Sequence, residues 1–336
     1  MAVKRPLCAA VHFGNAEANV LMRFHLFRIG ILYLALVCPL SPQTSLPPAI
    51  GNPGFDSLHT VNRPVETIDV HVHEVNLVLS VTDHKGKFVN NLRPSDFRIL
   101  DNGVEQTKVT FFRRETDFPI KIALVLDISA SIAFQFDEEK KAIKSFLKAV
   151  TRSSDSVMLF AFNQSVQLMS PITNNWDETA RRVKDINPEG ETALYDAVSD
   201  ASEWLALDSG PARHIMILVS DGGENKSKAT IDSAINSALK AEATIYSVNV
   251  SEEKLSDEVK RGAAVLKSLA EATGGTYLGY HKDTIAGAFD KIRRELRSQY
   301  ALAYKLSNPR GKTFHRLQVL VTNRWRVRCR SGYYVK

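Results

Sequence analysis

The sequence predicts an α/β protein: a doubly wound, mostly parallel sheet inserted into a small β-sandwich that both flanks of the chain form. Two observations favour this fold class. Between residues 118 and 297, short apolar runs alternate with amphipathic stretches of helical spacing, the pattern of a parallel sheet with helices on both faces. On either side lie short alternating segments bounded by turn residues, which is typical of antiparallel strands.

The start of the chain, residues 1–45, has the composition of an export signal. A basic stretch beginning at Met22 precedes a short apolar run and then Pro39. This order is typical of a secretory leader, and the run is shorter than the roughly 20 residues of a membrane span. We therefore expect a secreted, periplasmic or cell-envelope protein, with Met22 as a candidate true start. An uncleaved leader would be its only link to a membrane.

The next segments are expected to be a linker and the first half of the β-sandwich. Residues 46–65 are rich in Pro, Gly, Ser and Asn and predict a flexible linker. Residues 66–116 should supply strands, because apolar and polar side chains alternate from residue 68 to 81. A hairpin is expected between 97–100 and 107–112, around an Asp-Asn-Gly turn.

The tail, residues 298–336, is expected to be the second half of the sandwich. Residues 302–306 and 314–321 have the pattern of strands, and in 324–330 arginines alternate with apolar side chains. A group of so few strands is not stable alone. We therefore expect these strands to pair with those before residue 116. The arginines are interpreted as the solvated outer face of an edge strand. Beyond the leader, Cys329 is the one cysteine, which excludes an intrachain disulfide in the mature chain.

Between these flanks, residues 118–297 should hold the alternating sheet and its helices. Apolar runs predict buried strands that begin near residues 122, 157, 214 and 244, with short additional strands at 166–169 and 275–278. Amphipathic spacing predicts helices over 137–150, 177–186, 193–207, 230–241, 259–272 and 284–300.

Oxygen-bearing side chains follow two of these buried strands. The first strand leads into Asp127, Ser129 and Ser131, and the strand from residue 214 leads into Asp221. Thr192 lies in a loop that opens a helix. Ligands bind at the carboxyl ends of the strands in open α/β sheets, and carboxylate and hydroxyl oxygens suit a hard cation such as Mg²⁺.

The order Asp-x-Ser-x-Ser, then Thr192, then Asp221 resembles the metal-ion-dependent adhesion site of von Willebrand factor type A domains. The resemblance covers residues 118–297 and implies a Rossmann-like fold. It implies Mg²⁺ as cofactor, with Mn²⁺ or Ca²⁺ as alternatives, held by Asp127, Ser129, Ser131, Thr192 and Asp221. It further implies that Ser129, Ser131 and in some members Thr192 bind directly, while the two aspartates act largely through water. A partner protein's Asp or Glu carboxylate would complete the coordination shell.

The flanks carry a second resemblance. Segments 81–88, 92–97 and 101–106, with 300–304 and 330–334 near the end, look like the secreted bacterial von Willebrand factor A-related proteins that are numerous in acidobacteria. This resemblance supports an exported architecture more than a particular function.

Three hypotheses for function follow. The first is metal-dependent adhesion or protein recognition, and the second is a structural or assembly component of the envelope whose metal is purely structural. The third, a hydrolase, needs a nucleophile and a base. Ser129 or Ser220 could be the nucleophile, but no Gly-x-Ser-x-Gly elbow is present, so we expect no enzyme activity. His71 and His73 could bind zinc, but no third ligand joins them. The net charge of +6 is spread along the chain, and we expect no nucleic-acid partner. The sequence predicts no oligomeric state.

Overall fold

The computed structural model describes residues 74–115, 118–134, 136–207, 212–251, 256–279, 284–306 and 314–335. All of them belong to one compact unit, Ile68–Lys336. The expected leader and linker, and the histidines at 71 and 73, lie outside the described residues. Within the described ranges, no helix combines the length and the apolar character that a membrane crossing needs.

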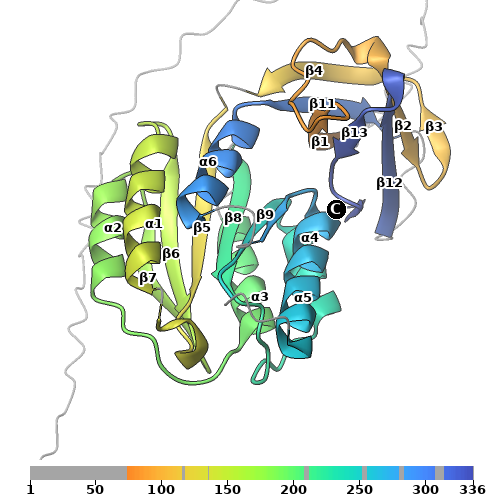
Figure 1. Cartoon of the computed structure of the whole chain (residues 1–336). Helices are drawn as coiled ribbons and strands as arrows, with labels where there is room; N and C mark the ends of the chain where they lie inside the picture. The colour runs from red at the N-terminus through yellow and green to blue at the C-terminus, as the bar shows by residue number, and fades with distance from the viewer. Residues whose placement is uncertain are drawn as a thin grey trace, which may run out of the picture. The chain divides into compact units, whose positions relative to one another are not determined.

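A six-stranded sheet forms the centre of this unit (Figure 1). Its strand order is β10-β9-β8-β5-β6-β7. All neighbours pair in parallel except β7, which runs antiparallel to β6. Every residue of β5 is buried, as expected for a strand covered on both faces. The bounds are β5 (Ile120–Asp127), β6 (Ser156–Phe162), β7 (Val166–Thr173), β8 (Arg213–Ser220), β9 (Ala243–Asn249) and β10 (Tyr277–Leu278).

Helices cover both faces of the central sheet, which confirms the doubly wound α/β prediction (Figure 1). One apolar core lies under α1, α2 and α6, and the other lies under α3, α4 and α5. The predicted apolar face of α1 is buried, with Ile143 and Leu147 fully inaccessible. The bounds are α1 (Phe136–Val150), α2 (Trp176–Lys184), α3 (Leu194–Leu207), α4 (Ile231–Lys240), α5 (Asp257–Thr273) and α6 (Ile285–Leu296).

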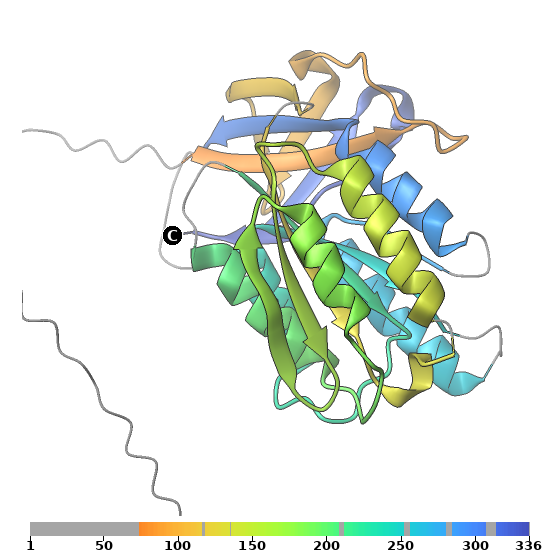
Figure 2. The same cartoon turned by 90° about the vertical axis from the view of Figure 1, so that its left-hand side faces the viewer.

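Strands from the two flanks pair with one another in two further sheets. Their orders are β13-β1-β11-β4 and β14-β12-β2-β3. Figure 2 shows β1 lying beside β11, and their register pairs Leu77 with Leu302. One core contains side chains from both sheets. The bounds are β1 (Glu74–Thr82), β2 (Phe97–Asp101), β3 (Val104–Gln106), β4 (Val109–Glu115), β11 (Gln299–Lys305), β12 (Phe314–Val321), β13 (Arg326–Arg328) and β14 (Gly332–Tyr334).

Two predicted elements, one in the flanks and one at the end of the central unit, are wrong in detail. The hairpin partner of β2 is the short β3, whereas β4 leaves that sheet and pairs with β11. The last helix ends at Leu296 rather than at residue 300, and β11 begins at Gln299. The cause is tertiary: Tyr300, Leu302 and Tyr304 alternate into the flank core, which a continued helix could not achieve.

The interpretation of the tail arginines as a solvated face is also wrong for two of them. Arg328 donates through Nη2 to Glu295 Oε2 at 2.9 Å, and Arg330 Nη2 donates to the carbonyl oxygen of Asn76 at 2.7 Å. Glu295 is only 3% exposed and also accepts a hydrogen bond from Ser80 Oγ at 2.9 Å. The alternation in the sequence shows which side chains share a face, but it does not show that a buried carboxylate on α6 meets that face.

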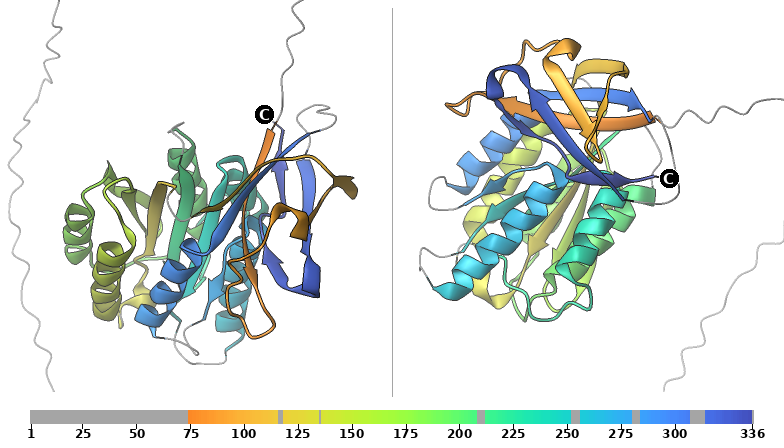
Figure 3. Two further views of the ribbon diagram at one scale, coloured as in Figure 1. Left: turned by 90° about the horizontal axis from the view of Figure 1, so that it is seen from above. Right: turned by 90° about the vertical axis from the view of Figure 1, so that its right-hand side faces the viewer.

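The tail also contacts helix ends of the central unit. Ser331 N and Ser331 Oγ both donate to the carbonyl oxygen of Ala272, each at 2.9 Å, and so occupy an end of α5. Tyr334 Oη donates to Asn236 Oδ1 on α4 at 2.9 Å. The right-hand view of Figure 3 shows the tail passing beside these two helices. The tail therefore fixes the flank sheets against the α4 and α5 side of the central sheet.

We expect the thiol of Cys329 to react slowly in the folded protein. Burial raises its pKa to about 11, so at pH 8 only roughly 0.1% of it is the nucleophilic thiolate. Alkylation of the Cys329 peptide, followed by mass spectrometry, should be at least tenfold slower in the native protein than in guanidinium. Equal rates in both states would contradict this burial.

Candidate metal centre

Asp127 ends β5 and lies against the end of the neighbouring strand β8. It is 1% exposed. Its Oδ1 accepts a hydrogen bond from the backbone N–H of Ser129 at 2.9 Å, and its Oδ2 accepts one from Ser220 Oγ at 2.6 Å. Because Ser220 is the last residue of β8, this second bond joins the carboxyl ends of two parallel strands. The carboxylate is thereby held in one orientation.

The surroundings of Asp127 disfavour its negative charge. The pKa of Asp127 is raised from 3.8 to about 6, chiefly by burial and also by the nearby carboxylate of Asp221, although hydrogen bonds from Ser129 and Ser220 act in the opposite direction. Two carboxylates close together in a buried setting favour a bound cation. The electrostatics of this edge therefore suit a divalent metal ion.

Ser129 and Ser131 lie on a tight turn directly after β5. The turn is the 3₁₀ helix η2 (Ala130–Ile132), and its apolar residue Ile132 is 1% exposed. The two hydroxyl oxygens are 3.2 Å apart. Ser129 is buried, while Ser131 is exposed. This pair therefore spans from the interior of the site to its solvent side.

The backbone N–H and the carbonyl oxygen of Thr192 both form hydrogen bonds with the loop after β8. The N–H of Thr192 donates to Asn225 Oδ1 at 3.0 Å, and its carbonyl oxygen accepts from the N–H groups of Asn225 and Lys226 at 3.0 and 3.1 Å. On the other side, the N–H of Ala130 donates to the carbonyl oxygen of Gly190 at 3.1 Å. The Thr192 loop is thus tied to both of the other loops of the site.

Asp221 follows β8 and completes the group. Its Oδ1 accepts the N–H of Gly223 at 2.8 Å. A β-carbon built on Gly223 would lie 3.1 Å from Asp221 Oδ1 and 3.8 Å from Thr192 Oγ1, so these two oxygens flank the same glycine. The structure therefore gathers all five predicted residues at one edge: Asp127, Ser129, Ser131, Thr192 and Asp221.

Two residues that orient this group were not predicted. Ser220 was considered only as a candidate nucleophile, although its hydroxyl is engaged by Asp127 and by the N–H of Gly222 at 2.9 Å. Asn225 holds Thr192 from a position 33 residues further along the chain. The sequence did contain a signal for Ser220, because it is a polar residue at the end of an otherwise apolar strand. No local signal identifies Asn225, because its role depends on how two loops meet.

The donor set fits Mg²⁺ better than it fits a softer metal. It offers two carboxylates and three hydroxyls, which are hard oxygen ligands, and Mg²⁺ keeps several waters when protein ligands are few. Within the described ranges, no group of three or more His, Cys, Asp or Glu side chains could hold a metal.

Comparison with known proteins supports the expected family. Residues 122–224 match the family described as the von Willebrand factor type A domain. That segment contains all five residues of the candidate metal centre. A comparison with curated proteins gave no match.

Several solved structures are similar to the chain. The conserved hypothetical protein BatB from Bacteroides thetaiotaomicron is 18% identical, with a TM-score of 0.43 over 53% of this chain and 97% of that one. The von Willebrand factor domain of the type V pili tip protein Mfa5 from Porphyromonas gingivalis is 14% identical, with a TM-score of 0.43 over 53% and 94%. A von Willebrand factor type A protein from Catenulispora acidiphila is 12% identical, with a TM-score of 0.44 over 79% and 73%.

Proposed function

Because residues 122–224 belong to a von Willebrand factor type A domain, we propose that this chain is an exported protein-binding module that holds a divalent cation and captures an acidic residue of a partner. The module binds and does no chemistry. Mg²⁺ is the proposed cation, and the leader-like start of the chain is the reason to place it outside the cytoplasm.

One observation carries this proposal: four oxygen-bearing side chains from three loops converge around a fifth, the buried aspartate Asp127, whose charge is disfavoured without a cation. Asp127 is almost inaccessible, and both its burial and the carboxylate of Asp221 raise its pKa. A bound cation offsets both effects. The serine hydroxyls and Thr192 add neutral oxygen ligands, which leave most of the positive charge of the metal uncompensated.

The exposure of Ser131 favours recognition over a purely structural metal. A structural ion is enclosed by protein ligands, whereas here one hydroxyl of the proposed ligand set faces solvent. A carboxylate from a partner can therefore approach from that side and replace a water on the metal. The role of this chain's residues is to hold the cation and keep that side open.

The hydrolase alternative receives no support from the geometry of the serines. Ser220 Oγ donates to Asp127 and accepts from a backbone N–H, and Ser129 Oγ lies beside Ser131 Oγ. A serine nucleophile needs a base within hydrogen-bond reach, usually a histidine. The described hydrogen bonds of these serines include none to a histidine.

The metal site is tested by two substitutions at one position. Thr192→Val removes the hydroxyl but keeps the branched shape and the backbone bonds to Asn225, so we expect Mn²⁺ or Mg²⁺ affinity to fall about tenfold. Thr192→Ser keeps the hydroxyl and should bind within about threefold of the native protein. Free Mn²⁺ is measured by electron paramagnetic resonance, and Mg²⁺ by competition. Unchanged binding in Thr192→Val, or none in the native protein, would overturn the proposal.

A further inference from the structure

Phe134 is the one exposed large apolar side chain that the described residues place at the same edge as the candidate metal centre. It is 57% exposed. The other exposed apolar side chains belong to the flank sheets or to the opposite end of the central sheet, where β7 and α3 end. These are Val104, Phe111, Ile172, Trp204, Leu207, Phe314 and Leu320.

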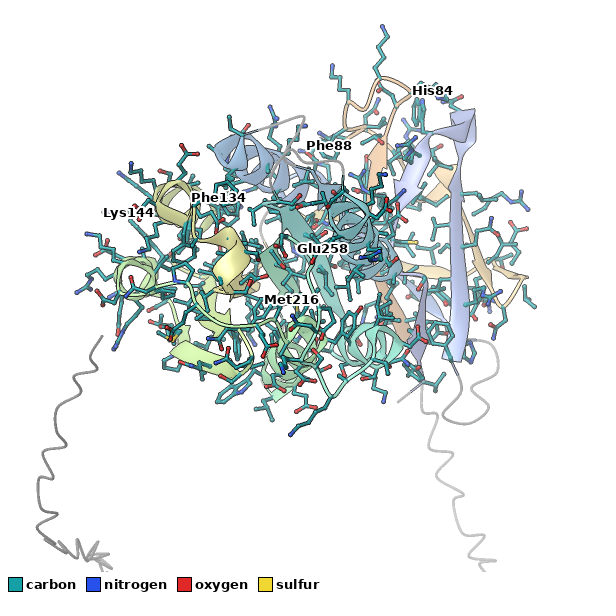
Figure 4. The ribbon with its side chains drawn as sticks, turned by 60° about the horizontal axis from the view of Figure 1, so that its bottom comes forward. His84, Phe88, Phe134, Lys144, Met216 and Glu258 are labelled. Atoms are coloured by element: carbon teal, nitrogen blue, oxygen red, sulfur yellow. The ribbon has the colours of Figure 1, made fainter. Side chains whose placement is uncertain are left out.

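The exposure of Phe134 is imposed by the fold around it. Ile132 and Phe136, two residues before and after it, are 1% and 2% exposed and belong to the core under α1. Ala133 and Phe134, which follow Ile132, are both exposed, and Figure 4 shows Phe134 close to the start of α1, with the site edge turned forward. A large aromatic ring is thus presented to solvent between two residues of the core.

Phe134 follows Ser131 by three residues. Residues Ala130–Ile132 form a 3₁₀ turn, and Ala133 continues in helical conformation with φ −53° and ψ −33°. Ser131 and Phe134 are both exposed. The aromatic side chain is therefore presented to solvent within one turn of the exposed serine of the proposed ligand set.

Charges around this edge restrict what can approach it. Asp137 and Glu138 form the first turn of α1, directly after the aromatic segment, and Asp257 and Glu258 form the first turn of α5. Lys226, a nearby basic side chain, is already paired with Glu191 at 2.9 Å. A broadly acidic partner surface would be repelled here, whereas a single carboxylate in an apolar and basic segment would not.

We propose, on the basis of the function proposed above, that Phe134 determines the specificity of the site. The recognised segment carries an Asp or Glu that reaches the metal, an aromatic or large aliphatic residue beside it that covers Phe134, and a basic residue beyond it that meets Asp137 and Glu138. Aromatic side chains held rigidly next to a polar anchor are typical of the residues that dominate binding.

The test uses three blocked peptides displayed at high density on a surface: Gly-Asp-Phe-Lys-Gly, Gly-Asp-Gly-Lys-Gly and Gly-Asn-Phe-Lys-Gly. Retention of the full chain is measured in Mg²⁺ and in EDTA. We expect the Asp-Phe-Lys peptide to retain the native protein about tenfold better than the Asp-Gly-Lys peptide, only in Mg²⁺. Phe134→Ala should remove this difference and leave Mn²⁺ affinity unchanged. Leu207→Ala, which removes an even more exposed apolar side chain at the opposite end, should change nothing.

The outcomes separate the two proposals. Equal Mg²⁺-dependent retention by the Asp-Phe-Lys and Asp-Gly-Lys peptides would overturn the role of Phe134 and leave metal-dependent capture intact. Equal retention by the Asn-Phe-Lys peptide would also overturn it, because the ring would then act without the metal. No Mg²⁺-dependent retention by any peptide would overturn carboxylate capture, and the specificity proposal would fall with it.

Discussion

Replacing Gly222 with alanine is expected to destabilise the protein by about 3 kcal/mol and to disrupt metal binding. Gly222 follows Asp221 with a φ of +82°, a conformation that alanine adopts only with strain. A β-carbon there would also overlap the carbonyl oxygen of Gly262 on α5. Because Gly262 in turn packs on the backbone of Asp221, any shift that relieves the overlap must move α5 or the metal-site loop.

Gly103→Ala is the matched control for this prediction. Gly103 has nearly the same φ, +81°, but a β-carbon added there would meet nothing within 4 Å, and the residue belongs to the turn between β2 and β3. The substitution should cost only about 1 kcal/mol, from backbone strain alone, and should leave Mn²⁺ affinity unchanged. Urea unfolding measures both costs. If the two variants lose equal stability, α5 does not pack closely on the Asp221 loop.

The central sheet was predictable because its signals are local. The apolar run of β5 and the amphipathic spacing of α1 each determine an element without reference to the rest of the chain. The five oxygen-bearing residues were named from a resemblance to a family motif, and that motif can be read locally because each residue follows a strand or opens a helix. Gly262 could not, because a glycine in a helix shows its purpose only when the loop packed against it is known.

The flanks were less predictable because their pairing is between distant segments. Both β3 and β4 have strand-like sequences, and the choice of partner for β2 depends on β11 and β12, some 200 residues later. Arg328 likewise has the pattern of a solvated residue until Glu295 is placed opposite it. These errors arise where an element satisfies its hydrogen bonds or charge through a remote partner.

Asp127→Asn is expected to stabilise the metal-free protein by about 3 kcal/mol at pH 7 while abolishing metal binding. The folded-state pKa of this carboxyl is about 6, against an ordinary value of 3.8, so the cost of its charge to the fold builds up as the pH rises from about 4 to about 6 and is fully present above pH 6. The neutral amide removes that cost. As the pH falls from 6 towards 4, the native carboxyl gains a proton and the advantage of the variant should disappear. Urea unfolding in EDTA between pH 4 and pH 8 measures this trend.

Asp101→Asn provides a contrast of opposite sign. Asp101 is also buried, but its Oδ2 accepts hydrogen bonds from Tyr304 and Tyr333, each at 2.6 Å, and its Oδ1 lies 2.7 Å from His315 Nδ1. An amide offers one acceptor oxygen in place of two and turns its NH₂ group toward either the tyrosine hydroxyls or His315 Nδ1, so this buried hydrogen-bond network is disturbed and the protein should lose about 2 kcal/mol. If Asp127→Asn destabilises in the same way, then hydrogen bonding rather than charge dominates at Asp127.

Adding Mg²⁺ should reverse the order of stability of the native protein and Asp127→Asn. A ligand that binds only the folded state stabilises it by about 4.1 kcal/mol at a thousandfold excess over its dissociation constant. The native protein gains this and the variant does not, so the native protein becomes the more stable of the two. If Mg²⁺ leaves the difference in unfolding free energy between the two proteins unchanged, then Asp127 does not take part in binding a cation. The cost of its buried charge would then not be offset by a metal at this edge of the sheet.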